Sequence, residues 1–206
     1  MKCYVATGNA GKAKEIKAMG EHFFPEIEEW IFRAPKDAEE TGSTFLENAK
    51  IKADALAAEL IEEGISSCFV LADDSGLEVE ALGGAPGIHS ARYAGDHVAP
   101  EKHISLLLNN MKQFTSLNDR ECNYTCALYL TVLLGKNRRE FSSIGTCEGF
   151  IGFESKGEFG FGYDPIFLML DKTTGIAELA EKEKNEISHR WDAFEQLVDE
   201  LREQTH

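Results

Sequence analysis

The fold of this chain is indicated most clearly by one stretch, Cys68-Phe69-Val70-Leu71-Ala72-Asp73-Asp74-Ser75-Gly76. Its first five residues are apolar and lie between turn-forming residues, which is typical of a buried strand. We therefore expect a central strand that ends at Asp73 and Asp74. Ligands of α/β proteins bind in the crevice at the carboxyl ends of such strands. The stretch thus predicts an α/β protein with an acidic site in this crevice.

On the amino-terminal side of this strand, strands and helices alternate. Residues 3–6 are apolar and predict a first strand, and a glycine-containing turn leads from it into a helix that starts at Lys12. A longer helix is expected to begin at Thr44, because Thr44 followed by Glu47 is the signature of a capping box. Gly64 marks the end of that helix. Alternation of this kind is typical of α/β folds.

On the carboxyl-terminal side, neighbouring strands dominate. Residues 124–134 are rich in β-branched and aromatic residues and predict a long strand, and residues 140–146 predict a second one, for which antiparallel pairing is one option. Ser188 is a good N-cap for a final helix. We therefore expect a mixed sheet rather than a purely parallel one. The length of 206 residues suits one large domain or two small lobes with a shared core.

Composition limits the class of protein. Hydrophobic residues make up 43% and charged residues 28%, as in ordinary soluble enzymes, and no apolar run is long enough to span a membrane. The amino terminus has no room for a signal peptide, so a cytoplasmic location is expected. A net charge of -15 argues against binding to a nucleic acid polymer but permits a small anionic substrate. The five scattered cysteines argue against a disulfide framework and indicate buried or half-buried thiols.

The turn after the first strand is a candidate anion site. Such a turn presents backbone N–H groups and the positive end of a helix, and its glycines let the backbone approach a phosphate. It is not a Walker A loop, because its glycines are too closely spaced and Ala13 replaces the hydroxyl that binds Mg2+. A simple tight turn is the alternative. The turn consists of Thr7, Gly8, Asn9, Ala10, Gly11 and Lys12.

Acidic residues supply candidate metal ligands and a candidate base. Adjacent residues of a strand face opposite sides, so Asp73 and Asp74 are expected to have different tasks, such as holding Mg2+ and activating water. An acidic turn is the alternative. Glu39 and Glu40 precede the long helix, and Lys52 lies beside the buried face of that helix. Lys52 would contact a phosphate or would cover apolar surface with its stem.

Two later segments contain groups that suit a nucleobase. Phe161-Gly162-Tyr163-Asp164 combines aromatic rings for stacking with a carboxylate, although a turn before a strand explains it equally well. Lys184, His189 and Arg190 are possible hydrogen-bond donors near the start of the final helix. A charged first turn of that helix is the alternative.

At these residues the chain strongly resembles the inosine triphosphate pyrophosphatase family. The matching segments occur in the family's order and are ATGNAGKAKE, EETGSTFLENAKIKA, LADDSGLEVEALGGAPGIHSARYAG, FGFGYDPIF and EKNEISHRWDAF. The resemblance implies an elongated mixed sheet flanked by helices, with two lobes around a central active-site cleft in a single domain over residues 1–206. It also implies a homodimer. Two departures, at Trp191 and at Glu158-Phe159, leave the expected chemistry intact and bear on base preference or the dimer surface.

The resemblance also implies a role for each matched residue. Residues Thr7 to Lys12 match the triphosphate turn, and Lys52 and Ser75 match contacts on the phosphate side. Asp74, with Asp73 beside it, matches the metal ligand and general base, and Glu40 matches a second metal ligand, with Glu39 as its alternative. The nucleobase set is matched by Phe161, Gly162, Tyr163, Asp164, Lys184, His189 and Arg190.

The expected activity is Mg2+-dependent hydrolysis of ITP, dITP and XTP to the monophosphate and pyrophosphate. Hypoxanthine and xanthine carry a 6-oxo acceptor, which suits the donors His189 and Arg190, whereas the 6-amino donor of adenine does not. Two alternatives remain: a related pyrophosphatase for modified or pyrimidine nucleotides, and a nucleotide-binding regulator without catalysis.

Overall fold

The computed structural model describes residues 1–204, which form two compact units. Unit 1 contains residues 1–74 and 126–145 and the chain from residue 190 onward, and unit 2 contains residues 75–125 and 146–189. Strands β3, β4 and β5 contribute residues to both units. Within residues 1–204, no helix combines the length and the apolar character that a membrane span requires. The elements in chain order are β1 (Lys2–Val5), α1 (Ala10–Phe23), β2 (Glu29–Phe32), α2 (Phe45–Glu62), β3 (Ser67–Val79), η1 (Glu80–Leu82), η2 (Gly87–Arg92), α3 (Pro100–Asn110), η3 (Leu117–Asp119), β4 (Glu121–Leu134), β5 (Asn137–Ile151), η4 (Asp164–Ile166), β6 (Phe167–Leu168), η5 (Ile176–Glu178), α4 (Glu181–Glu186) and α5 (His189–Glu203).

The strands form a mixed sheet, as expected for this α/β chain. Its six strands have the order β2-β1-β3-β4-β5-β6. Strand β1 is parallel to β2 and to β3, whereas β5 and β6 are antiparallel. Strands β4 and β5 are neighbours joined by the two residues Gly135 and Lys136, and a link this short permits only antiparallel pairing.

The central strand is longer than the sequence pattern predicts. Residues 68–72 are indeed a strand, but β3 does not end at Asp73 and Asp74 and continues to Val79. The prediction was wrong because β3 keeps a neighbour, β4, after its other neighbour ends. The last register pair of β1 with β3 joins Val5 to Leu71. The two aspartates therefore lie beyond the carboxyl end of β1 but inside β3.

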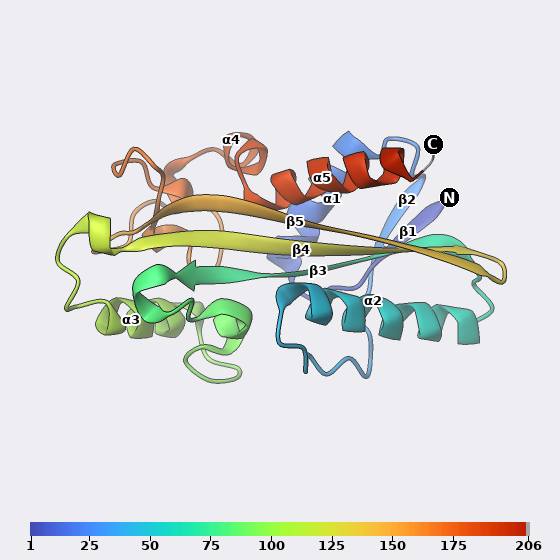
Figure 1. The fold of residues 1–206 in the computed structure, drawn as a ribbon, viewed down its shortest axis with the longest axis horizontal. Helices are drawn as coiled ribbons and strands as arrows, with labels where there is room; N and C mark the ends of the chain where they lie inside the picture. Colours follow the sequence, from blue (N-terminus) through green and yellow to red (C-terminus); the bar gives the residue numbers. More distant parts are fainter. Residues whose placement is uncertain (205–206) are drawn as a thin grey trace. The chain divides into compact units, whose positions relative to one another are not determined.

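Helices pack on both sides of the strands of unit 1. Figure 1 shows α5 on one side of these strands and α2 on the other. Helix α2 begins as predicted, since the Thr44 hydroxyl accepts a hydrogen bond from the Glu47 N–H. It ends before Gly64, whose φ of 83° is the left-handed conformation typical of a helix end. Helices α1 and α5 share one core with the strands, which includes Cys3, Val5, Ile16, Met19, Leu71, Leu128, Phe194 and Leu197.

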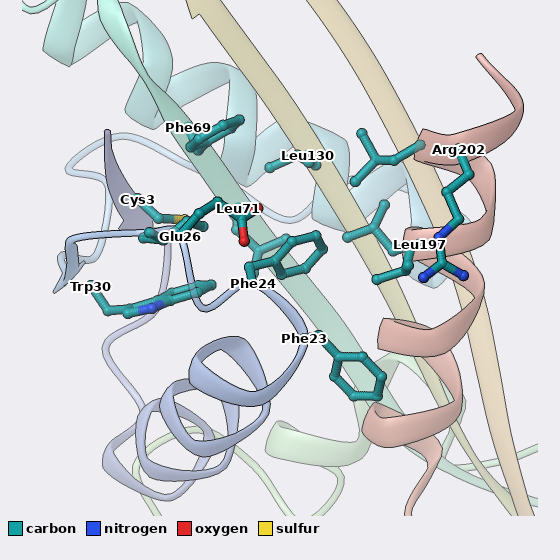
Figure 2. Close-up of a pocket in the computed structure, with 13 residues that line it drawn as sticks. Cys3, Phe23, Phe24, Glu26, Trp30, Phe69, Leu71, Leu130, Leu197 and Arg202 are labelled. Carbon is teal, nitrogen blue, oxygen red and sulfur yellow. The ribbon is translucent and has the colours of Figure 1, made fainter. Parts of the chain in front are cut away.

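Unit 1 also contains an apolar cavity of about 340 Å³. Figure 2 shows Phe23, Phe24 and Trp30 lining it, together with Leu197 from α5. Only two charged side chains, Glu26 and Arg202, line this cavity. A triphosphate requires several cations, so the chemistry of the cavity does not suit a nucleotide.

Unit 2 has a separate core and a buried arginine. The core contains apolar residues of β3, α3 and β4 and of the segment around η4. Arg120 is 2% exposed, and its guanidinium donates hydrogen bonds to the carbonyl oxygens of Met111, Phe114, Ile151 and Gly152. It thereby ties the end of α3 to the end of β5. The five cysteines, which belong to both units, are all buried and free, as predicted.

Candidate active site

The turn between β1 and α1 is capped by its own side chains. Asn9 is the N-cap of α1, and its side-chain oxygen accepts a hydrogen bond from the Lys12 N–H at 3.1 Å. The Thr7 hydroxyl accepts a hydrogen bond from the Asn9 N–H, also at 3.1 Å. Gly8, Asn9 and Ala10 are exposed. The predicted anion turn is therefore an ordered, accessible start of a 14-residue helix, which carries a partial positive charge.

Asp73 belongs to a buried cluster of charges. Its carboxylate accepts from Lys12 at 3.0 Å and from Arg190 at 3.5 Å, and the Arg190 guanidinium also pairs with Glu15 at 2.6 Å. Asp73 is 1% exposed and Arg190 is 2% exposed. Burial disfavours the charge of Asp73, but Lys12 and Arg190 outweigh it and hold the pKa of this carboxyl well below its ordinary value. The structure thus places Arg190 in unit 1, beside Lys12 and Asp73.

Asp74 belongs to a different cluster, around Lys52. The Lys52 ammonium lies 3.0 Å from Asp74 and 2.9 Å from Glu40, and the Asn48 amide donates to Asp74 at 3.2 Å. Burial raises the pKa of Asp74; Lys52 and Lys12 oppose this rise, and the charge of Glu40 adds to it. Burial disfavours the charge of Lys52, but its carboxylate neighbours outweigh burial and raise the pKa of Lys52.

The two aspartates face opposite sides of the sheet, as their adjacent positions predict. Asp73 contacts side chains of α1 and α5, whereas Asp74 contacts side chains of α2. The two acidic positions before α2 also differ. Glu40 contacts Lys52, whereas Glu39 is exposed. The geometry therefore favours Glu40 over Glu39 as the partner of Asp74.

The Lys52 cluster fits Mg2+ only with help from a substrate. Glu40 and Asp74 both contact the same Lys52 nitrogen, so their carboxylates lie close enough together to share one cation, which is the Lys52 ammonium in this structure. No group of three His, Cys, Asp or Glu side chains suited to a metal occurs within residues 1–204. Mg2+ characteristically uses one or two carboxylates and completes its shell with water and phosphate oxygens. The donor set fits that pattern.

A third polar cluster lies in unit 2, around Asp164. Its carboxylate accepts from Lys184 at 2.6 Å, from the Tyr124 hydroxyl at 3.0 Å and from the Phe161 N–H at 2.8 Å. Lys184 also lies over the Phe161 ring, with its nitrogen 5.1 Å from the ring centre. Asp164 and Lys184 are buried, whereas Phe161 is half-buried and Gly162 is exposed. The structure thus brings together three of the predicted nucleobase residues.

The other predicted residues of unit 2 are placed differently. The His189 ring stacks on Tyr124, with the ring centres 4.8 Å apart. The Tyr163 ring is buried, and its hydroxyl donates to the Ser90 carbonyl at 2.9 Å, so this ring belongs to the core rather than to an exposed stacking surface. Burial raises the pKa of Tyr163. Ser75 is half-buried and directly follows Asp74.

Sequence reasoning missed three residues of these clusters. Glu15 lies three positions after Lys12, and Asn48 lies four positions before Lys52, so helical spacing alone could have indicated both. Tyr124 had no such signal. It reads as an ordinary strand residue, and only tertiary structure brings it to Asp164 and His189.

The fold is that of an α/β protein, and its clusters combine a glycine-containing turn, a helix start and two lysines held by carboxylates. These are groups of the kind that bind phosphorylated ligands. Comparison with known proteins is consistent with this class. The chain belongs to the Ham1 family, whose model matches residues 3–200.

Curated relatives and a solved structure match over almost their full length. A protein of Exiguobacterium sibiricum named dITP/XTP pyrophosphatase is 43% identical, over 96% of this chain and 95% of that protein. A protein of the same name from Bacillus anthracis is 40% identical, over 97% and 95%. The structure of a HAM1 protein from Coxiella burnetii has a TM-score of 0.81 and 36% identity, covering 98% of this chain and 99% of that one.

Proposed function

We propose that this protein hydrolyses non-standard purine nucleoside triphosphates, namely dITP, ITP and XTP, to the monophosphate and pyrophosphate with Mg2+. The chain is a hydrolase of the nucleoside-triphosphate pyrophosphatase class, in keeping with the shared name of its full-length relatives. One observation carries the proposal. Lys52 is held between Glu40 and Asp74. This cluster therefore places a cation for a phosphate group, two carboxylates for a metal ion and a candidate base close together.

Asp74 is the base in this proposal, because Asp73 is committed to Lys12 and Arg190 on the other side of β3. A water molecule gives its proton to the Asp74 carboxylate while its oxygen bonds to the α-phosphorus. The bond from the α-phosphorus to the bridging oxygen breaks, and the electron pair leaves with pyrophosphate. Lys52 and Lys12 stabilise the negative charge that develops on the leaving group.

Mg2+, held by Glu40 and Asp74, would add Lewis-acid neutralisation of the triphosphate charge. The turn from Thr7 to Lys12 contributes backbone N–H groups of the α1 start to the phosphates. Asp73 keeps Lys12 in place through their 3.0 Å contact. Each of these residues then acts on the phosphates or on a group that contacts them.

The Asp164 cluster is the proposed reader of the base. The half-buried Phe161 ring offers a stacking face, and Lys184 and His189 offer donors to the 6-oxo group of hypoxanthine or xanthine. The 6-amino group of adenine would place a donor against these donors, so ATP and dATP are rejected. Arg190 is anchored by Glu15 and Asp73, and its assignment to the base stays a prediction.

The test is a product assay with dITP, ATP, GTP and dTTP, each with and without Mg2+. We expect pyrophosphate and dIMP from dITP and little product from the other nucleotides. Orthophosphate would mean attack at the γ-phosphorus and would refute the mechanism. Equal turnover of dTTP would indicate the pyrimidine alternative, and nucleotide-dependent thermal stabilisation without any product would indicate a binding protein.

Lys52→Met tests the residue that carries the proposal, and Lys50→Met is its matched control. Lys50 lies on the same helix, but its 45% exposed side chain pairs with Asp54. We expect the Lys52 variant to lose nearly all turnover and the Lys50 variant to retain it. Equal activity of the two variants would remove Lys52 from the site.

The proposed homodimer rests on the family resemblance alone. We propose a cytoplasmic homodimer that removes non-standard nucleotides from the pool. Light scattering after size exclusion gives the mass in solution, to be compared with 22.9 kDa for one chain. A mass of one chain at micromolar concentration would refute the dimer.

A further inference from the structure

Tyr124 links two side chains of the proposed base site that come from different elements. It lies on β4 and is 7% exposed. Its hydroxyl donates a hydrogen bond of 3.0 Å to Oδ1 of Asp164, a residue that lies just before β6 in the chain. Its ring stacks on the ring of His189, the first residue of α5, with centres 4.8 Å apart and planes 16° apart. One side chain therefore contacts the loop carboxylate and the imidazole.

The hydroxyl of Tyr124 has a specific task at Asp164. Two other donors to this carboxylate, Lys184 and the Phe161 N–H, both bind Oδ2. The Tyr124 hydroxyl occupies Oδ1, so the carboxylate is held at both oxygens and cannot rotate without losing a bond. Its orientation in turn sets where the Lys184 ammonium lies, 2.6 Å from Oδ2.

Packing alone does not require a tyrosine at this position. The Tyr124 ring also stacks on Phe167, with centres 4.8 Å apart, and a phenylalanine would make the same ring contacts. A buried phenol needs a hydrogen-bond partner and gains nothing from apolar burial of its oxygen. The hydroxyl is therefore explained by Asp164 rather than by the core.

We propose that Tyr124 is a positioning residue for base selectivity, acting through Asp164 and Lys184 with its hydroxyl and through His189 with its ring. It does not take part in the attack on phosphorus. The inference rests on the proposed function, because it assigns these three groups to the base of the substrate. It predicts that changes at Tyr124 act on substrate affinity and base choice and spare the chemical step.

Tyr124→Phe removes the hydroxyl and keeps the ring. We expect the KM for dITP to rise about 3- to 10-fold, with kcat within about twofold of wild type. This rise is smaller than the roughly 10- to 150-fold effect of directly losing a hydrogen bond to a charged group, because the hydroxyl acts on the substrate only through Asp164. The preference for dITP over dATP falls by a similar factor. Tyr129→Phe is the control, because Tyr129 lies on the same strand but faces Lys50. It is expected to change none of these values.

A double-mutant cycle separates positioning from general support of the fold. In an Asp164→Ala background the hydroxyl has no carboxylate to hold, so Tyr124→Phe should have no further effect on KM. Tyr124→Leu removes the ring, and it should shift the NMR signals of the His189 imidazole, which Tyr124→Phe leaves in place. A general loss of stability would instead lower activity equally in both backgrounds.

The outcomes are distinguishable. A wild-type protein without dITP hydrolysis refutes the proposed function and, with it, the role of Tyr124. An active wild type with an unchanged KM and unchanged selectivity in Tyr124→Phe refutes this inference alone. A lower kcat at unchanged KM would also refute it, because the hydroxyl would then act in the chemical step.

Discussion

Asparagine substitutions at Asp73 and Asp74 should have very different effects on stability, although the residues are adjacent. Around Asp73, two cations (Lys12 and Arg190) meet two anions (Glu15 and Asp73 itself) in the interior. Asp73→Asn leaves two cations against one carboxylate. Removing one partner of a buried ion pair costs about 3–5 kcal/mol, and the remaining Glu15 places the cost near the lower end, about 3 kcal/mol.

Around Asp74 the carboxylates, not the cations, would be in excess. One cation, Lys52, meets two carboxylates there, Glu40 and Asp74, so Asp74→Asn leaves one of each. The same conclusion follows from linkage. The pKa of Asp73 is lowered by folding, so its charge stabilises the folded state at neutral pH, whereas the pKa of Asp74 is raised, so its charge opposes folding there. We expect Asp74→Asn to change stability by less than about 1 kcal/mol, with a gain favoured.

Thermal unfolding at pH 7.5 without added metal measures the difference. For a chain of this size, about 3 kcal/mol corresponds to roughly 6–12 °C in Tm. We expect this loss for Asp73→Asn and a nearly unchanged Tm for Asp74→Asn, with turnover of dITP almost abolished in both. The control is Asp54→Asn, since Asp54 is 39% exposed and pairs with Lys50 at the surface, where ion pairs contribute little. Equal Tm losses at positions 73 and 74 would refute the reasoning.

Further tests concern the buried Arg120, the cysteines and the apolar cavity of unit 1. Arg120→Met should lower the free energy of unfolding by about 3–5 kcal/mol in urea titration, because four carbonyl oxygens lose their donor. Arg139→Met, at an exposed arginine, should change the free energy of unfolding by less than about 1 kcal/mol. A similar loss in both variants would contradict the prediction. The five buried thiols should react with a disulfide reagent only after denaturation, since burial raises the pKa of Cys126 to about 12, and rapid reaction in native buffer would contradict this. Val198→Leu should fill part of the apolar cavity and raise Tm, adding about 0.5–1 kcal/mol, and a lower Tm would mean that the cavity wall has no room.

Much of the local structure was predictable because it depends on neighbouring residues. The start of α2 at Thr44 follows from a hydrogen bond between residues three apart, and the end at Gly64 follows from one backbone conformation. The opposite facing of Asp73 and Asp74 follows from the period of a strand. These features need no knowledge of distant residues.

The extent of β3 was not predictable in this way. Ser75 and Gly76 read as a turn, but a strand continues for as long as a neighbouring strand stays beside it. That neighbour, β4, lies some fifty residues further along the chain. The role of Tyr124 was not predictable for the same reason, because its partners Asp164 and His189 lie 40 and 65 residues away in sequence.

By itself the sequence determined the α/β class, the capped helices and the order of the motifs, because each depends on contacts within one turn or one strand. Only the tertiary structure decided the pairing of the charges. It brings Arg190 to Glu15, 175 positions away, and Lys52 to Asp74, 22 positions away. Asp73 thereby contacts two cations, whereas Asp74 contacts one cation, Lys52, which also pairs with Glu40. The strength of an interaction between charges depends on the distance between them and on their burial, and the order of residues along the chain specifies neither directly.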